Sequence, residues 1–166
     1  MQTADHDLLP SVSAWILAYS GRGRAAIGEF ELVHILDRAP TRFPVPRAPR
    51  HCHEVMLWEQ QVLPYVDLAM LDRPARMPHG SDKANAGSTI VAIVGYQTDQ
   101  RQPPRYGALK LCAIPKRASV SNDSACRLPE DIGAVAGFAC SCFRHPEFGA
   151  VPVLDLPRIF SPERSG

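Results

Sequence analysis

The sequence predicts a mostly β protein built as two small barrels or sheets, because prolines and short apolar runs dominate it. Its 166 residues include 16 prolines and 11 glycines, and proline is excluded from helix interiors because it lacks an amide donor. Hydrophobic residues make up 45% and charged residues 21% of the chain, which is the balance of a folded protein. The length suits one ordinary domain, or two very small ones that share a core.

The first part of the chain alternates strand-like runs with turn residues. An apolar run rich in strand formers covers residues 15–20, and Gly21 and Gly23 then mark a hairpin-type turn. The apolar pattern resumes over residues 24–36. Within that stretch, residues 32–36 fit a buried strand and one face of a helix equally well, so both alternatives stay open.

A proline-rich corner and a polar stretch frame the middle of the chain. Residues 39–50 contain four prolines, which predicts a corner. Apolar segments follow at 54–61 and 62–71, and the second is as continuously apolar as a strand buried on both faces. Residues 73–88 are polar, contain proline and glycine, and lack periodicity, so we expect an exposed, mobile loop and the best internal boundary there.

The second half repeats the strand pattern. Residues 89–97 form the clearest strand of the sequence, and residues 106–114 form another that can pair with it as a hairpin. Residues 115–132 are mostly polar and are expected to be a connection. The apolar segments 134–143 and 149–160 complete the pattern.

Charge and motif content argue against several functions. The 18 Lys and Arg against 17 Asp and Glu leave a formal charge of +1, which disfavours non-specific nucleic-acid binding through phosphate neutralisation. No apolar run approaches the roughly 18 to 20 residues that span a bilayer, and the N-terminus does not read as a signal peptide. We therefore expect a cytoplasmic protein without membrane insertion. The sequence contains no Gly-rich phosphate loop and no G-x-S-x-G nucleophile elbow.

Two clusters of histidine and cysteine are the remaining chemical candidates. His51 and His53 flank a cysteine and could offer two nitrogens to a metal, but a closed zinc site needs four ligands. Cys140 and Cys142, with His145 nearby, lie in apolar surroundings, where cysteine more often packs as a small hydrophobe. The five cysteines are expected to be reduced. We expect no metal and no cofactor, with a small metal- or redox-dependent enzyme built on these clusters as a remote alternative.

One phrase occurs twice and is the strongest pattern in the sequence. Residues 62–71 read VLPYVDLAML and residues 150–160 read AVPVLDLPRIF. Each copy has a proline, apolar residues, Asp-Leu and an amphipathic tail. An Asp at a strand end commonly caps the turn or short helix that follows, so we assign Asp67 and Asp155 a structural role and not a catalytic one.

On these phrases the chain resembles the chemotaxis coupling proteins, the family of CheW-like domains, as a divergent member. Residues 43–49 stand for the family's proline corner, 62–68 for its central "vlPvvDL" phrase, and 153–161 for its C-terminal "llDLdrLL" phrase. The resemblance covers residues 14–161, and the order of the phrases is more specific than any one of them. The structural positions of the motifs are Pro46, Pro64, Asp67, Leu68, Asp155 and Leu156.

The chain departs from the family at one motif. Counted back from Pro64 without a gap, the family's Asn-Leu-Arg-Gly positions hold Leu57, Trp58, Glu59 and Gln60. In the family this region lies at the surface used for receptor and kinase contacts, so these four residues are the partner-binding candidates. The reversed charge at Glu59 and the lost glycine argue against ordinary receptor coupling. Trp58 can equally be an interface anchor or a core residue.

The resemblance implies a CheW-like fold of two small five-stranded, SH3-like β-barrels with a few short helices, in one domain over 14–161 between tails 1–13 and 162–166. The function it implies is a non-enzymatic adaptor that couples the regulatory domain of a CheA-type histidine kinase to the cytoplasmic tip of a chemoreceptor. The alternative is a divergent CheW-like scaffold, for example in type IV pilus or twitching control, that has lost receptor or kinase coupling.

Overall fold

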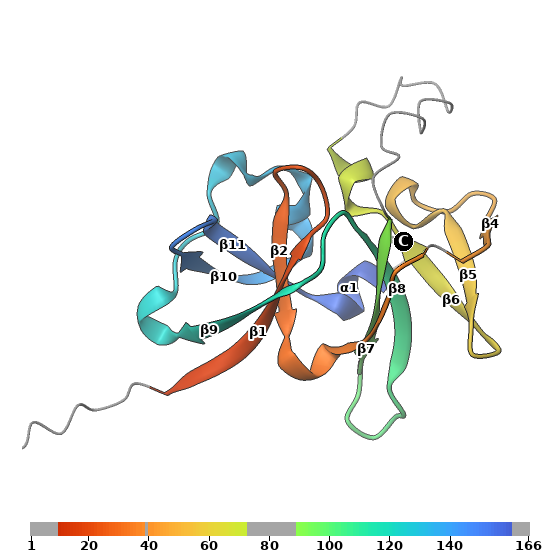
Figure 1. Ribbon diagram of the computed structural model, residues 1–166, viewed down its shortest axis with the longest axis horizontal. Coiled ribbons are helices and arrows are strands. Elements are labelled where there is room, and N and C mark those ends of the chain that lie inside the picture. Colours follow the sequence, from red (N-terminus) through yellow and green to blue (C-terminus); the bar gives the residue numbers. More distant parts are fainter. Residues whose placement is uncertain (1–9, 39, 73–88, 161–166) are drawn as a thin grey trace, which may run out of the picture.

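The computed structural model describes residues 10–38, 40–72 and 89–160. Its strands form two curled sheets that lie side by side (Figure 1). The loop predicted at 73–88 and the C-terminal tail predicted at 162–166 lie outside the described residues. No helix in the described ranges is both long enough and apolar enough to cross a membrane.

The first sheet, sheet A, has five strands in the order β10-β11-β2-β1-β9. Neighbouring strands are antiparallel except β11 and β2, which pair in parallel. Its strands are β1 (Ser11–Ala18), β2 (Arg24–Gly28), β9 (Lys116–Ser121), β10 (Ala139–His145) and β11 (Gly149–Leu154).

The second sheet, sheet B, has six strands in the order β3-β7-β8-β6-β5-β4. Its neighbours are antiparallel except β6 and β8, which pair in parallel. Its strands are β3 (Leu32–Leu36), β4 (Arg42–Pro44), β5 (Glu54–Trp58), β6 (Gln61–Val66), β7 (Ile90–Tyr96) and β8 (Arg105–Leu111).

The helices are short, as proline content predicts. One α-helix, α1 (Leu156–Phe160), follows β11. The connections contain 3-10 helices, which are η1 (Glu29–Glu31), η2 (Arg50–Cys52), η3 (Leu68–Leu71), η5 (Asn122–Ser124), η6 (Glu130–Ile132) and η7 (Ala134–Phe138). The prediction of a mostly β fold with a few short helices is confirmed.

The structure corrects the prediction at the sheet edges. Residues 116–121, predicted as part of a polar connection, are the edge strand β9, which pairs with β1. Ser121 at the end of β9 pairs with Ser11, so β1 begins at Ser11, inside the stretch expected to be a tail. Residues 32–36 are a strand and not a helix, but β3 lies at the edge of sheet B with Val33 45% exposed, so the strand is not fully buried. The short strand β4 gives sheet B a sixth strand, where five were expected.

Each sheet combines strands from both halves of the chain. The hairpin β1–β2 belongs to sheet A, whereas β3 to β6 belong to sheet B; the hairpin β7–β8 belongs to sheet B, whereas β9 to β11 belong to sheet A. The first half of the chain therefore contributes the hairpin β1–β2 to sheet A, whose other strands come from the second half. The second half contributes the hairpin β7–β8 to sheet B, whose other strands come from the first half. The second strand of each hairpin makes the parallel pairing, β2 with β11 and β8 with β6. The boundary predicted at 73–88 separates the two halves in sequence, but it does not separate the sheets.

Three apolar clusters account for the continuous hydrophobic runs. The largest lies between the sheets and takes residues from both, and a smaller one lies inside the curl of each sheet. Strand β7 shows the consequence: Ile90, Ala92 and Val94 belong to the shared cluster, whereas Val91 and Ile93 belong to the cluster within sheet B. A strand buried on both faces needs apolar residues at every position, which explains why this strand was the clearest in the sequence.

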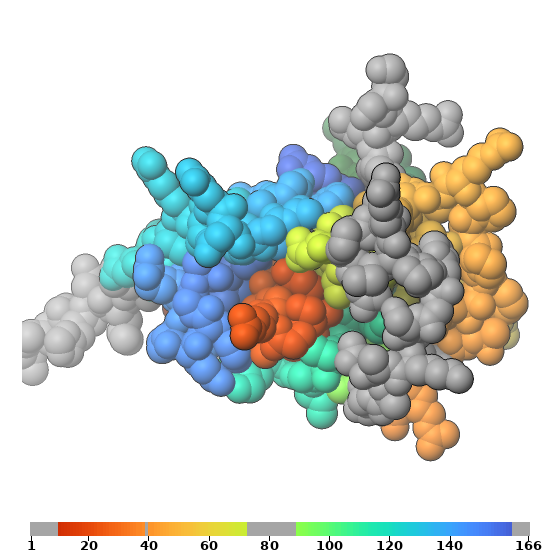
Figure 2. All heavy atoms as spheres, turned by 90° about the horizontal axis from the view of Figure 1, so that it is seen from above, coloured from red at the N-terminus to blue at the C-terminus, as the bar shows by residue number. Residues whose placement is uncertain are grey.

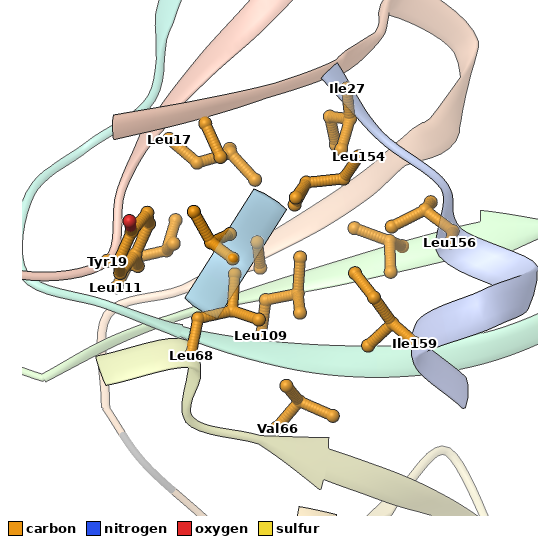
Figure 3. Packing of buried hydrophobic residues seen from close by; sticks show 14 of the residues in the cluster. Leu17, Tyr19, Ile27, Val66, Leu68, Leu109, Leu111, Leu154, Leu156 and Ile159 are labelled. Atoms are coloured by element: carbon orange, nitrogen blue, oxygen red, sulfur yellow. The ribbon is translucent and has the colours of Figure 1, made fainter. Parts of the chain in front are cut away.

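Helix α1 crosses from one sheet to the other. It follows β11 of sheet A, and its Leu156 and Ile159 point into the shared cluster (Figure 3). At its end the Phe160 ring stacks on Tyr96 of sheet B with ring centroids 5.2 Å apart. A Cβ atom at Gly107 of β8 would lie 2.4 Å from the Phe160 ring, so the close approach of α1 to β8 requires a glycine there.

Candidate partner-binding surface

The partner-binding candidates lie on the hairpin formed by β5 and β6. Trp58 pairs with Gln61 at its end, and Glu59 and Gln60 form the two-residue turn. Both turn residues have positive φ, 45° at Glu59 and 67° at Gln60. Two-residue hairpin turns of this kind favour Asn-Gly or Asp-Gly, so Gln60 holds a left-handed conformation in which a glycine would be unstrained.

The four candidates divide between the two faces of this hairpin. Leu57 points outward and is 55% exposed, and Glu59 and Gln60 are exposed at the tip. Trp58 points inward and packs on the cluster within sheet B, where its ring lies 6.1 Å from that of Tyr106 and 6.4 Å from that of His34. The ring is half-buried, so Trp58 supports the hairpin from within, and its exposed part is left for a contact.

The outward side of β4, β5 and β6 is an apolar surface, which we call the hairpin face. Pairing places Phe43 beside Val55 and Val55 beside Pro64 in one row. The next row on the same side pairs Leu57 with Val62, the latter 67% exposed. Strand alternation explains the arrangement, because neighbours of these residues such as Met56 and Leu63 point inward and are buried.

The hairpin face gathers exposed hydrophobic side chains. Of the eight large hydrophobic residues exposed in the described part of the chain, four lie on β4, β5, β6 or directly after β4: Phe43, Val45, Leu57 and Val62. Figure 2 shows the light-orange atoms of β4 and β5 at one end of the molecule, away from the blue atoms of β10 and β11. A concentration of this kind marks an interaction site more often than scattered single residues do.

Charged groups lie beside this face and at its tip. Arg42 donates a hydrogen bond to the Tyr65 hydroxyl at 3.0 Å, lies over the Tyr65 ring and pairs with Glu54 at 3.8 Å. Burial raises the pKa of Tyr65 and the Arg42 cation opposes that rise, so Tyr65 stays a neutral donor and acceptor at physiological pH. Glu59 forms no ion pair with any described residue, and its charge therefore stands at the tip of the hairpin.

Asp67 and Asp155 cap the short helices that follow β6 and β11. The Asp67 carboxylate accepts from the Ala69 amide at 3.1 Å and from Lys110 Nζ at 3.2 Å, and Asp155 Oδ1 accepts from the Arg158 amide at 3.3 Å. The leucine after each Asp, Leu68 and Leu156, is buried in the shared cluster. The two Asp-Leu phrases thus fix corresponding corners of the two sheets.

The prolines of the motifs have separate positions. Pro64 lies within β6, where it pairs with Val55 on the hairpin face. Pro46 lies in the exposed connection between β4 and η2, next to Arg47, whose φ is 63°. The corner is closed by a hydrogen bond from the Val45 amide to the His53 carbonyl at 2.7 Å.

His51 and His53, the first histidine cluster, contact other parts of the chain and not each other. His51 is buried, its ring centroid lies 5.0 Å from that of Phe138, and its Nε2 has no hydrogen-bond partner. Burial lowers the pKa of His51, so the ring is neutral near pH 7. His53 points elsewhere, with Nδ1 2.7 Å from the Arg50 carbonyl oxygen.

The second cluster does not join the first. On β10, Cys142 is buried, whereas Cys140 is exposed and lies at a register shift. The His145 ring stacks on Phe148 at 5.0 Å. Among the described residues, no three His, Cys, Asp or Glu side chains are arranged to hold a metal ion.

Sequence reasoning missed Phe43 and Val62 as parts of this surface. A usable signal was present, because the two residues at 59–60 make a tight hairpin and strand alternation then places Leu57 and Val62 on one side. The position of Phe43 depends on β4, which is only three residues long and contains proline, so its pairing could not be recognised from the pattern.

Comparison with known proteins identifies the fold. No known family matches the sequence, and no curated protein matches it. Among solved structures, the chain is similar to the scaffolding protein TtCheW from Thermoanaerobacter tengcongensis, with a TM-score of 0.67 and 10% sequence identity over 98% of this chain and 96% of that one. At this identity the likeness concerns the fold, and the predicted CheW-like fold is confirmed.

Proposed function

We propose that the protein is a non-enzymatic, cytoplasmic adaptor of a chemotaxis-type signalling pathway, which couples a CheA-type histidine kinase to a chemoreceptor through protein contacts. The observation that carries the proposal is a CheW-like fold with an exposed apolar surface on the strands around the divergent motif. The similar solved structure is that of a scaffolding protein. An adaptor acts through surfaces of this kind and needs no cofactor.

The hairpin face has the composition of a contact surface. Phe43, Leu57 and Val62 are 53%, 55% and 67% exposed, and they project from paired strands that hold them in fixed positions. Burying such side chains against a partner removes apolar surface from water and costs little conformational freedom. Leu57 and Val62, in one row, are the residues whose loss weakens partner binding most.

Binding of the kinase regulatory domain by substituted proteins tests the proposal. We expect Leu57→Asp and Val62→Asp each to weaken binding by at least about tenfold, because each places a charge in an apolar contact. Ile114→Asp is the matched control, since Ile114 is 70% exposed and lies between β8 and β9, away from the hairpin face. Equal binding by all three folded variants would place the kinase contact elsewhere.

Glu59 supplies the test of receptor coupling. Glu59→Arg restores the family's charge at the tip of the hairpin and is expected to raise affinity for a conventional receptor tip. Glu130→Arg, an equal charge change on exposed η6, is the control and is expected to have no effect. If kinase binding is strong while neither the natural protein nor the Glu59→Arg variant binds receptor fragments, the protein is a scaffold that has lost receptor coupling.

A further inference from the structure

Two cysteines that are distant in sequence meet on sheet A. The Cys126 thiol donates to the Cys142 sulfur across 3.3 Å. Their backbones are also joined, because the Cys126 amide donates to the Cys142 carbonyl at 3.0 Å. The adjacent residues Ala125 and Phe143 form an antiparallel bridge, so Cys126 and Cys142 lie directly opposite each other on neighbouring extended segments.

This geometry suits a disulfide. Opposed residues of an antiparallel pair have Cα atoms about 4.5 to 5.5 Å apart, within the range of about 4.4 to 6.8 Å that disulfides occupy. The sulfurs need to approach by about 1.3 Å from their present 3.3 Å to reach bonding distance. Side-chain rotation supplies a movement of that size, so the backbone pairing can stay in place.

We propose that Cys126 and Cys142 are an oxidisable thiol pair, which hydrogen peroxide converts to a disulfide that ties β10 to the segment after η5. In the first step the Cys126 thiol is oxidised to a sulfenic acid and the peroxide is reduced to one water. In the second, the Cys142 sulfur attacks the Cys126 sulfur, the S–S bond forms, the S–O bond breaks, and the hydroxyl group leaves with the thiol proton as a second water.

Burial assigns the order of the two steps. Cys126 is half-buried, whereas Cys142 is buried. Burial raises the pKa of Cys142 to about 12, so Cys142 is protonated at neutral pH and is the poorer nucleophile toward peroxide. Cys126 is therefore oxidised first, and Cys142 is the resolving thiol held beside it.

The disulfide would close a loop that carries part of the shared core. Between the two cysteines lie η6 and η7, and Val135 of η7 is fully buried against both sheets. The Phe138 carbonyl accepts from the Asp155 amide at 2.7 Å just before α1. Oxidation is thus expected to fix the segment that covers the junction of the sheets, and to slow amide hydrogen exchange in residues 127–138.

Peptide mapping and thiol titration of the full chain test the proposal. After treatment with hydrogen peroxide, the five free thiols are expected to fall to three, and a disulfide-linked pair of peptides containing Cys126 and Cys142 should appear with a loss of two hydrogen atoms. Cys126→Ser is expected to abolish this linked pair. Cys140→Ser, at an exposed position on the same strand, should leave it intact.

The opposite results are equally clear. A linked pair through Cys140, Cys112 or Cys52, or oxidation of Cys126 to a sulfinic acid with Cys142 still free, would overturn the proposal. Cys142 is buried, so a substitution there can unfold the protein. Cys126→Ser, at the half-buried position, therefore carries the test, and its circular dichroism spectrum should match that of the natural protein.

Discussion

Asp67 shows how one side chain can hold a corner of the fold. Its carboxylate caps η3 and pairs with Lys110, and only 12% of the side chain is exposed. Asp67→Ala removes the cap, which contributes about 1 kcal/mol, and leaves the partly buried Lys110 ammonium unpaired. We expect a loss of about 2 kcal/mol in the free energy of unfolding, measured by chemical denaturation.

The control for this prediction is the second Asp-Leu phrase. Asp155 is 29% exposed and its ion pair with Arg158 is longer, at 3.8 Å, so Asp155→Ala should cost about half as much. A larger effect at Asp155, or an Asp67 variant of normal stability with weakened kinase binding, would contradict the structural role given to Asp67.

His51 predicts a pH dependence of stability. Burial lowers its pKa in the folded protein. Above the unfolded pKa of about 6.5 the ring is neutral in both states. As pH falls below that value, the unfolded chain takes up the proton first, so the free energy of unfolding should decrease.

Denaturation of the natural protein and His51→Leu between about pH 7.5 and pH 5 measures this effect. The natural protein should lose stability more steeply than the variant over this range, because leucine cannot take up a proton. Parallel pH profiles would show that His51 does not titrate differently in the folded and unfolded states.

The turn of the β5–β6 hairpin holds Gln60 in a strained backbone conformation. Gln60 has a φ of 67°, and a left-handed conformation costs a residue other than glycine about 1 kcal/mol or more. Gln60→Gly is therefore expected to raise the free energy of unfolding by about 1 kcal/mol. Gln61→Gly, one position later in regular strand, is the control and should lower it by about 0.5 to 1 kcal/mol. Destabilisation by both substitutions would rule out strain at the turn.

The elements that could be predicted from sequence are those with buried faces. The hairpin of residues 89–97 and 106–114 was predicted, and it appears as β7 and β8, because nearly every position of β7 is buried. Strand β9 was missed because it is an edge strand in which only Ala118 is buried. Lys116 and Arg117 are exposed and pair with Glu147 and Glu29. Because these charged residues interrupt the apolar pattern, the strand could not be recognised from the sequence.

The resemblance to the CheW-like family pointed to residues 57–60 as the candidate surface. Strand pairing in the structure added Phe43 and Val62, which the sequence pattern did not identify. Periodicity shows which residues share a face, but it does not show which strands are neighbours. The exchange of hairpins between the sheets was hidden for this reason, as was the row that joins Phe43 to Val55 and Pro64.

Because each half of the chain contributes a hairpin to the other half's sheet, we expect the whole molecule to unfold in one transition. Sheet A needs β9 to β11 from the second half of the chain, and sheet B needs β3 to β6 from the first, so neither sheet is complete without both halves. The only two tryptophans report on different sheets: Trp15 lies in β1 and Trp58 in β5.

Fluorescence of the single-tryptophan variants Trp15→Phe and Trp58→Phe tests this prediction. Each variant should unfold in one transition, at the same midpoint when followed by fluorescence and by far-ultraviolet circular dichroism. The fluorescence of each then reports one sheet and the circular dichroism reports both. A fluorescence transition that precedes the circular dichroism transition in either variant would mean that one sheet unfolds alone.

Calorimetric titration of the purified protein with the regulatory domain of the CheA-type kinase from the same organism tests the proposed adaptor function. We expect a one-to-one complex with micromolar or tighter affinity, which Leu57→Asp weakens and Ile114→Asp leaves unchanged. Absence of binding to every such kinase of the organism would contradict the adaptor function, although the fold would stand.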